Sequence, residues 1–195
     1  KTGAEYTIAM TPALQPRPRQ RAFSMLLAIA LGLAAGFAGP ALAGPPPEIQ
    51  KLVRQGQYPL ALEKIDAYLA ETPGDAEARF LKGVVLSETG KPAEAIEIFM
   101  RLTEEYPEMP EPYNNLAVLY AQQKLYERAR GALEMAIQAH PSYAIAWENL
   151  GDLYVKMATQ SYEKAAQLDP KGRTAGSKLT LARDMLRVQA KSGTK

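Results

Sequence analysis

The chain has 195 residues, of which 47% are hydrophobic and 23% charged, a composition that fits a globular domain and not a disordered chain. It contains no cysteine, which excludes disulfides, thiolate nucleophiles and thiolate metal sites. The formal net charge is only +2, which gives no indication of a nucleic-acid partner.

Residues 1–43 have the pattern of a secretory signal peptide. Three arginines precede the apolar run SMLLAIALGLAAGFAGPALA, which ends in the triplet Ala41-Leu42-Ala43. This arrangement predicts cleavage before Gly44 and an exported protein, periplasmic or secreted. The alternative is an uncut N-terminal anchor that leaves the protein facing the periplasm, because the run is about long enough to span a bilayer. We expect translation to start at Met10, since a start at Met25 would discard the arginines.

Removal of residues 1–43 leaves an uneven distribution of charge. Residues 44–170 hold 12 basic and 19 acidic side chains, whereas residues 171–195 hold 7 basic and 1 acidic. The basic C-terminal segment either contacts an anionic surface such as membrane lipid or forms a solvated helix face, which is the simpler interpretation. The segment has no aromatic residue, which argues against binding of single-stranded nucleic acid by stacking.

A repeat of 34 residues occupies the middle of the chain. Residues 76–109 align with residues 110–143, and residues 42–75 fit the same spacing one period earlier. A fixed period of this length indicates a stacked array of identical units. Small residues recur where two helices of one unit would approach each other, at Ala61, Gly83, Ala95, Ala117 and Ala129. Each second helix is followed by a proline that stops it, at Pro73, Pro107, Pro141 and Pro170.

These residues resemble the tetratricopeptide repeat (TPR), a helix pair with small residues at positions 8 and 20, an aromatic or aliphatic residue at 24 and proline at 32. The resemblance covers roughly residues 46–170 and implies an all-α fold, the α–α superhelix of a TPR solenoid. We therefore divide the chain into the signal segment (1–43), a TPR array (44–170) and a basic capping helix with tail (171–195). The array comprises repeats 42–75, 76–109 and 110–143 and a compressed repeat 144–170.

The compressed repeat lacks five residues. Gly151 is followed by Pro170 after 19 positions, whereas Gly83 is followed by Pro107 after 24. No glycine or proline lies between Asp152 and Asp169, and the apolar residues continue at helical spacing. The sequence therefore predicts one unbroken helix over about 145–167, with an amphipathic helix over about 174–190 as its partner. A tight turn near residues 156–159 is the alternative, but no helix breaker is present there.

The sequence shows no arrangement of residues that is typical of a catalytic site. His140 is the only histidine, and it directly precedes the helix-stopping Pro141. Without cysteine, a histidine cluster or a glycine-rich phosphate loop, we expect no enzyme, no metal site and no cofactor.

The family resemblance implies a concave face lined by the first helix of each repeat, which binds a protein or peptide partner. An apolar floor with acidic edges would suit a peptide that is apolar and partly basic. The alternative is that Val84 and Val118 only pack between neighbouring helices. Asn115 is expected to bond backbone rather than grip a carboxylate, because the basic residues of a carboxylate-binding groove are missing. The candidate partner-binding residues are Glu77, Phe80, Val84, Ser87, Glu111, Asn114, Val118, Ala121, Glu148, Asp152 and Val155.

Taken with the signal segment, this pattern predicts an exported scaffold that binds a partner protein or peptide and not nucleic acid. The alternative function is a cell-envelope assembly factor held near the membrane by its basic C-terminal helix.

Overall fold

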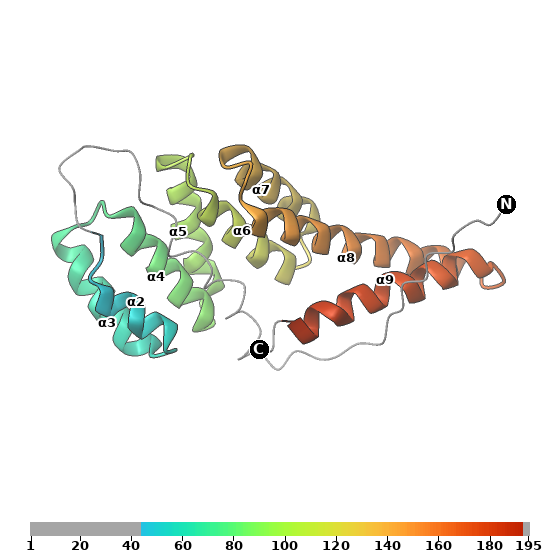
Figure 1. Ribbon diagram of the computed structural model, residues 1–195, viewed down its shortest axis with the longest axis horizontal. Helices are drawn as coiled ribbons and strands as arrows, with labels where there is room; N and C mark the ends of the chain where they lie inside the picture. The colour runs from blue at the N-terminus through green and yellow to red at the C-terminus, as the bar shows by residue number, and fades with distance from the viewer. Residues whose placement is uncertain (1–43, 193–195) are drawn as a thin grey trace. The chain divides into compact units, whose positions relative to one another are not determined.

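The computed structural model describes the backbone of residues 44–192 and the side chains of residues 44–188, so the predicted signal segment lies outside the described residues. Every regular element in this range is an α-helix (Figure 1), which confirms the predicted all-α fold. The helices are α2 (Pro47–Arg54), α3 (Tyr58–Glu71), α4 (Ala76–Glu88), α5 (Pro92–Glu105), α6 (Pro110–Gln122), α7 (Tyr126–Ala139), α8 (Ala144–Leu168) and α9 (Arg173–Ser192).

The helices repeat with the period of the sequence. Helices α3, α5 and α7 each have 14 residues and begin at positions 58, 92 and 126. Helices α4 and α6 each have 13 residues and begin at 76 and 110, whereas α2 has only 8. The short first helix follows from the run of prolines at 45–47, because proline is accepted in the first turn of a helix but not in its interior.

The turn after each first helix requires a left-handed backbone. Gly56 and Gly90 have φ of 69° and 79°, and the equivalent residue one period later is Lys124 with φ of 62°. Glycine adopts this conformation without steric cost, whereas a residue with a Cβ does so at a cost of about 1–2 kcal/mol. The third repeat therefore keeps the turn geometry although it lacks the glycine.

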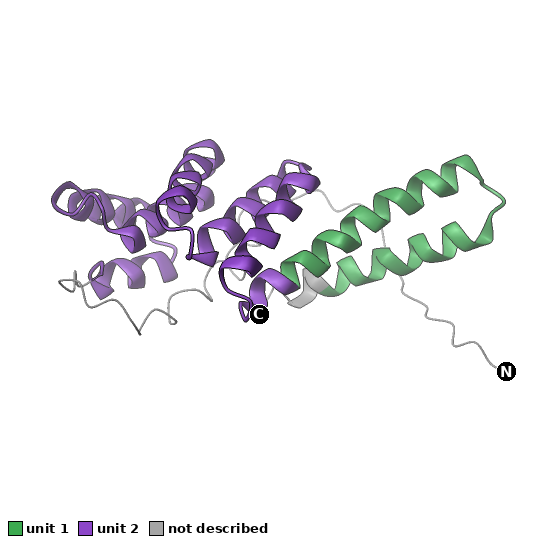
Figure 2. Cartoon of the chain, turned by 90° about the horizontal axis from the view of Figure 1, so that it is seen from above, with its two compact units in different colours: residues 1–21, 148–195 green, residues 22–147 purple. Residues whose placement is uncertain are grey.

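The chain divides into two compact units (Figure 2). In the unit that ends at Trp147, the small residues predicted to lie between paired helices are buried: Ala61, Ala95 and Ala129 are 0% exposed. Gly83 of α4 is buried against α5, since a Cβ at this position would lie 2.6 Å from Cε1 of Phe99. The paired-helix geometry predicted from the 34-residue period is thus present in the packing.

The other unit, described from Glu148 to Ser192, contains most of α8 and all of α9. Helix α8 runs unbroken for 25 residues, roughly 37 Å at 1.5 Å per residue, as predicted from the missing turn. Helices α8 and α9 lie side by side in both views (Figures 1 and 2). Arg183 Nη2 of α9 lies 2.6 Å from Glu163 Oε1 of α8, and Ala182 is buried.

Candidate functional site

The first helices of successive repeats form one layer. Helix α2 contacts α4, and α4 contacts α6, so the candidate residues on α4 and α6 belong to a single surface. These residues are Glu77, Phe80, Val84 and Ser87 on α4, and Glu111, Asn114, Val118 and Ala121 on α6. The remaining candidates, Glu148, Asp152 and Val155, lie on α8 in the other compact unit.

Burial divides the predicted residues into two groups. Phe80 and Val84 are only 6% and 5% exposed, and Asn114 is fully buried. The Phe80 ring lies 5.6 Å from the ring of Phe99, centroid to centroid, so Phe80 is part of the packing between α4 and α5. Ser87, Glu111, Val118 and Ala121 are half-buried and present surface, as do Asp152 and Val155, while Glu148 is exposed.

Asn115 makes the kind of contact that was predicted for it. Its Nδ2 donates a hydrogen bond of 2.9 Å to the backbone carbonyl of Glu111, one turn earlier in α6. Asn115 is also only 2% exposed, so its side chain contributes to the packing of α6.

Glu111 is a half-buried carboxylate at the start of α6. Burial raises its pKa, and among the described residues its Oε2 has no hydrogen-bond partner. Burial also raises the pKa of Tyr143, with a further contribution from the negative charge of Glu111. The Tyr143 hydroxyl likewise has no hydrogen-bond partner in the described part of the chain. A hydrogen bond from its own backbone N–H and the nearby charge of His140 lower the pKa of Glu111 but do not cancel the effect of burial, so this corner of the surface favours a further cation.

Glu88 occupies the opposite end of the surface, at the C-terminus of α4. Burial raises its pKa, and only one of its oxygens, Oε2, lies near a donor, the Tyr58 hydroxyl at 3.5 Å. Burial, with the charge of Glu88, raises the pKa of Tyr58 to about 12. Within residues 44–188, Oε1 of Glu88 has no hydrogen-bond partner. The family resemblance places Glu88 on the concave face, but its burial depends on packing against α3.

Glu77 lies one repeat before Glu111, in the same first turn of its helix. Its Oε1 accepts a hydrogen bond of 2.7 Å from Gln50 Nε2 of α2. Burial, followed by the charge of Asp75, raises the pKa of Glu77. The second oxygen faces the start of the described chain, because a Cβ built on Gly44 would lie 2.5 Å from Oε2.

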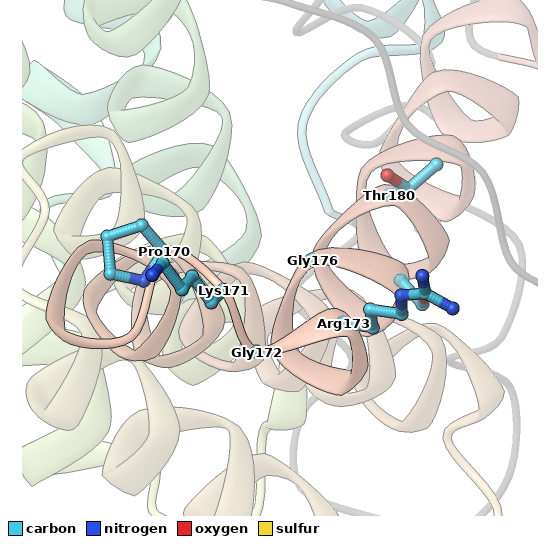
Figure 3. A pocket seen from close by; sticks show the side chains of 7 residues that line it. Pro170, Lys171, Gly172, Arg173, Gly176 and Thr180 are labelled. Carbon is cyan, nitrogen blue, oxygen red and sulfur yellow. The ribbon is translucent and has the colours of Figure 1, made fainter.

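A solvent-open hollow of about 570 Å³ lies at the turn between α8 and α9 (Figure 3). It contains none of the predicted groove residues, and no aromatic or acidic side chain lines it. Its lining consists of Pro170, Lys171, Gly172, Arg173, Gly176, Ser177 and Thr180. Because the hollow is open to solvent and no side chains converge in it, we assign it no ligand.

The described residues contain no group of three or more histidine, aspartate or glutamate side chains arranged to hold a metal ion. His140 is exposed, and its Nδ1 lies 3.3 Å from Ser142 Oγ, which satisfies it locally. No helix between residues 44 and 192 combines the length and apolar character needed to cross a bilayer.

Two arginines of the basic C-terminal helix form ion pairs with acidic residues of the protein itself. Arg183 pairs with Glu163, and Arg187 Nη1 lies 2.5 Å from Asp184 Oδ1 in the same helix. The positive charge counted in the sequence is therefore an upper limit on what α9 offers to an anionic surface.

Comparison with known proteins supports the repeat. Two family models described as tetratricopeptide repeat match residues 48–110 and 89–153. The tetratricopeptide repeat domain-containing protein PYG7, chloroplastic, of Arabidopsis thaliana is 28% identical over 86 residues, which is 42% of this chain and 29% of that protein. The present chain thus matches less than a third of the length of this relative.

Two solved structures share the fold. The crystal structure of MamA matches with a TM-score of 0.51 and 24% identity, covering 75% of this chain and 90% of that one. The structure of Naa15/Naa10 bound to HypK-THB matches with a TM-score of 0.52 and 18% identity, covering 75% of this chain and 23% of that one. At this identity the likeness concerns the helical architecture alone.

Proposed function

Because this chain belongs to the tetratricopeptide-repeat family, we propose that it is an interaction scaffold whose α4–α6 surface binds a basic segment of a partner protein. Tetratricopeptide repeats form non-catalytic binding scaffolds, and by extension we propose that this chain is not an enzyme. The proposal concerns the unit that ends at Trp147, in which α4 and α6 contact each other.

The observation that carries the proposal is the burial of two carboxylates, Glu88 and Glu111, on this surface. Each carboxylate is half-buried with a raised pKa, and each keeps one oxygen without a hydrogen-bond partner among the described residues. The unpaired oxygens are themselves buried, so a lysine or arginine side chain of a partner would act from the solvent side, by offsetting the charge of each half-buried carboxylate. Val118 and Ala121, both half-buried on α6, offer apolar surface for the rest of the segment.

A charge-neutral double substitution tests the site. We expect Glu88→Gln with Glu111→Gln to weaken binding of basic, apolar peptides from an array at least tenfold, with the unfolding midpoint retained or raised. The matched control is Glu63→Gln with Glu104→Gln, two exposed carboxylates on α3 and α5, which should bind as the parent does. Equal loss in both variants would show that general negative charge attracts the peptides. Loss in neither would show that the partner binds elsewhere.

We also propose that the protein is exported and cleaved before Gly44. Support comes from the signal-type sequence of residues 1–43 and from the surroundings of Gly44. The backbone nitrogen and a Cβ position on one Cα are about 2.5 Å apart, so a new α-ammonium at Gly44 would lie within about 5 Å of Glu77 Oε2. The partly buried Glu77 would then gain a cationic partner.

Intact mass and N-terminal sequencing of protein recovered from the periplasm test this directly, with Gly44 as the expected first residue. Thermal unfolding of that species, with and without N-terminal acetylation, should show a loss of stability on acetylation that disappears in Glu77→Gln. A full-length chain retained in the membrane would support the uncut anchor instead.

The alternative function, a membrane-held assembly factor, depends on the charge of residues 171–195 and gains nothing from the paired Arg183 and Arg187. Co-sedimentation with anionic vesicles at low and high salt, with and without residues 171–195, separates it from the scaffold. We expect no binding that depends on this segment.

A further inference from the structure

The fused repeat exposes a helix face that the other repeats cover. Position 11 of successive repeats is occupied by Leu86, Tyr120 and Tyr154, and these side chains are 2%, 6% and 48% exposed. Helices α4 and α6 each contact the second helix of their own repeat, α5 or α7, and Arg128 of α7 lies over the Tyr120 ring. In α8 the chain continues straight through the position of the turn, so no second helix of its own repeat folds back.

The uncovered face is a regular seam. Six residues of α8 alternate at spacings of three and four, the pattern of one edge in a coiled coil. All six are exposed or half-exposed, and Leu168 reaches 73%. We call this set the α8 seam: Gly151, Tyr154, Ala158, Ser161, Ala165 and Leu168.

Helix α9 does not cover the seam. Its contacts are with the side of α8 that carries Glu163, the partner of Arg183, and Tyr162, whose ring centre lies 5.9 Å from Lys178 Nζ. At 100° per residue this side lies about a third of a turn from the seam. The seam thus leaves two large apolar side chains, Tyr154 and Leu168, exposed among small residues, which indicates an association surface.

We propose that α8 pairs in antiparallel orientation with α8 of a second copy of this chain. A two-fold axis near Ala158 places Tyr154 opposite Ser161 of the other copy, and Gly151 opposite Ala165, so that a large side chain faces a small one and small faces small. The pairing is self-complementary, as an isologous dimer requires.

The loss of the turn gives a reason for this partner. In a complete repeat the second helix folds back on the first and carries a small residue at position 20. In the fused repeat that position is Ala158. Because α8 is straight, its second half, which carries Ala158, cannot fold back onto its first half. In the antiparallel dimer, the second half of α8 from one copy lies against the first half of α8 from the other copy. Shortening of a hinge loop is a known route to such domain swapping.

The size of the seam predicts the strength of the dimer. An aromatic side chain carries roughly 150–250 Å² of surface, so the exposed half of Tyr154 offers about 100 Å². Leu168 adds a similar area and the other seam residues are small, so the total falls below the roughly 1,000 Å² of a stable specific interface. We therefore expect a dimer that dissociates in the micromolar range rather than a permanent one.

Sedimentation velocity of the full chain over a concentration series tests the pairing. We expect a monomer–dimer equilibrium in the parent and a dissociation constant at least tenfold higher in Tyr154→Lys, which places two charges in the seam. The matched control Gln160→Lys alters an exposed residue of α8 about a third of a turn from the middle of the seam and should leave the equilibrium unchanged. A parent that stays monomeric to millimolar concentration would overturn the proposal, as would an unchanged equilibrium in Tyr154→Lys.

A cross-link provides the second measurement and does not depend on a destabilising charge. Because the chain has no cysteine, Ala158→Cys introduces a single thiol at the expected two-fold axis. Mild oxidation should yield a covalent dimer much faster than for Gln160→Cys. Equal rates for the two variants would place the contact elsewhere and refute the antiparallel seam.

Discussion

Gly83→Ala is a direct probe of how closely the paired helices approach. Alanine in place of glycine inside a helix normally stabilises it by about 1 kcal/mol. At Gly83 the added methyl would lie 2.6 Å and 2.8 Å from two carbons of the Phe99 ring, which is itself 0% exposed and cannot move aside. Overpacking of this kind typically costs about 1–3 kcal/mol. We expect a net loss of up to about 2 kcal/mol, which corresponds to a fall in Tm of up to roughly 8 °C.

The matched control is Gly131→Ala in α7, where the new Cβ would meet no atom within 4 Å. This variant should gain about 0.5–1 kcal/mol from helix propensity alone. Urea unfolding followed by circular dichroism measures both variants against the parent. If Gly83→Ala is as stable as Gly131→Ala, then α4 and α5 do not pack through Gly83, and the paired-helix geometry is wrong.

Three further substitutions test local features of the fold. Lys124→Gly should stabilise the protein by about 1 kcal/mol in urea unfolding, because it removes the strain of a positive φ; destabilisation would mean that the Lys124 side chain has a role of its own. Asp75→Ala should cost about 1 kcal/mol in the same assay, since Asp75 Oδ1 accepts a hydrogen bond of 2.8 Å from the Ala78 backbone at the start of α4. For Glu111 the folded-state pKa is raised, so the folded chain binds more protons than the unfolded chain just above the ordinary value of 4.5. The stability contribution of Glu111 should therefore rise as the pH falls through the raised pKa, and Glu111→Gln should be more stable than the parent at pH 7 and lack this dependence. A Gln variant that is less stable at pH 7 would show that burial of the Glu111 charge does not destabilise the fold.

Much of the fold was predictable because its determinants are local or periodic. The continuity of α8 follows from the absence of glycine and proline between Asp152 and Asp169, and the small residues at 34-residue spacing mark where helices approach. The positive φ of Lys124 was not predicted, although its position 34 residues after Gly90 is a signal that could have indicated it.

The predicted site was harder to define because burial of a side chain depends on distant residues. Phe80 holds a position that lines the groove in the family pattern, yet its ring packs toward Phe99, 19 residues later in the sequence. The raised pKa of Glu111 likewise depends on burial beside Tyr143, which no local pattern reveals. The role of the half-buried residues in binding a partner stays a prediction.

The central claim is that two helices of a repeat have become one, and a distance within α8 tests it most directly. The chain has no native cysteine, so Glu148→Cys with Gln167→Cys, both at exposed positions, provides two unique sites for spin labels. Labelled protein diluted with unlabelled protein reports the distance within one chain by pulsed electron paramagnetic resonance. A continuous helix predicts a backbone separation of about 29 Å for 19 residues. A separation of about 10 Å, the spacing of two packed helices, would show a hairpin and contradict the account.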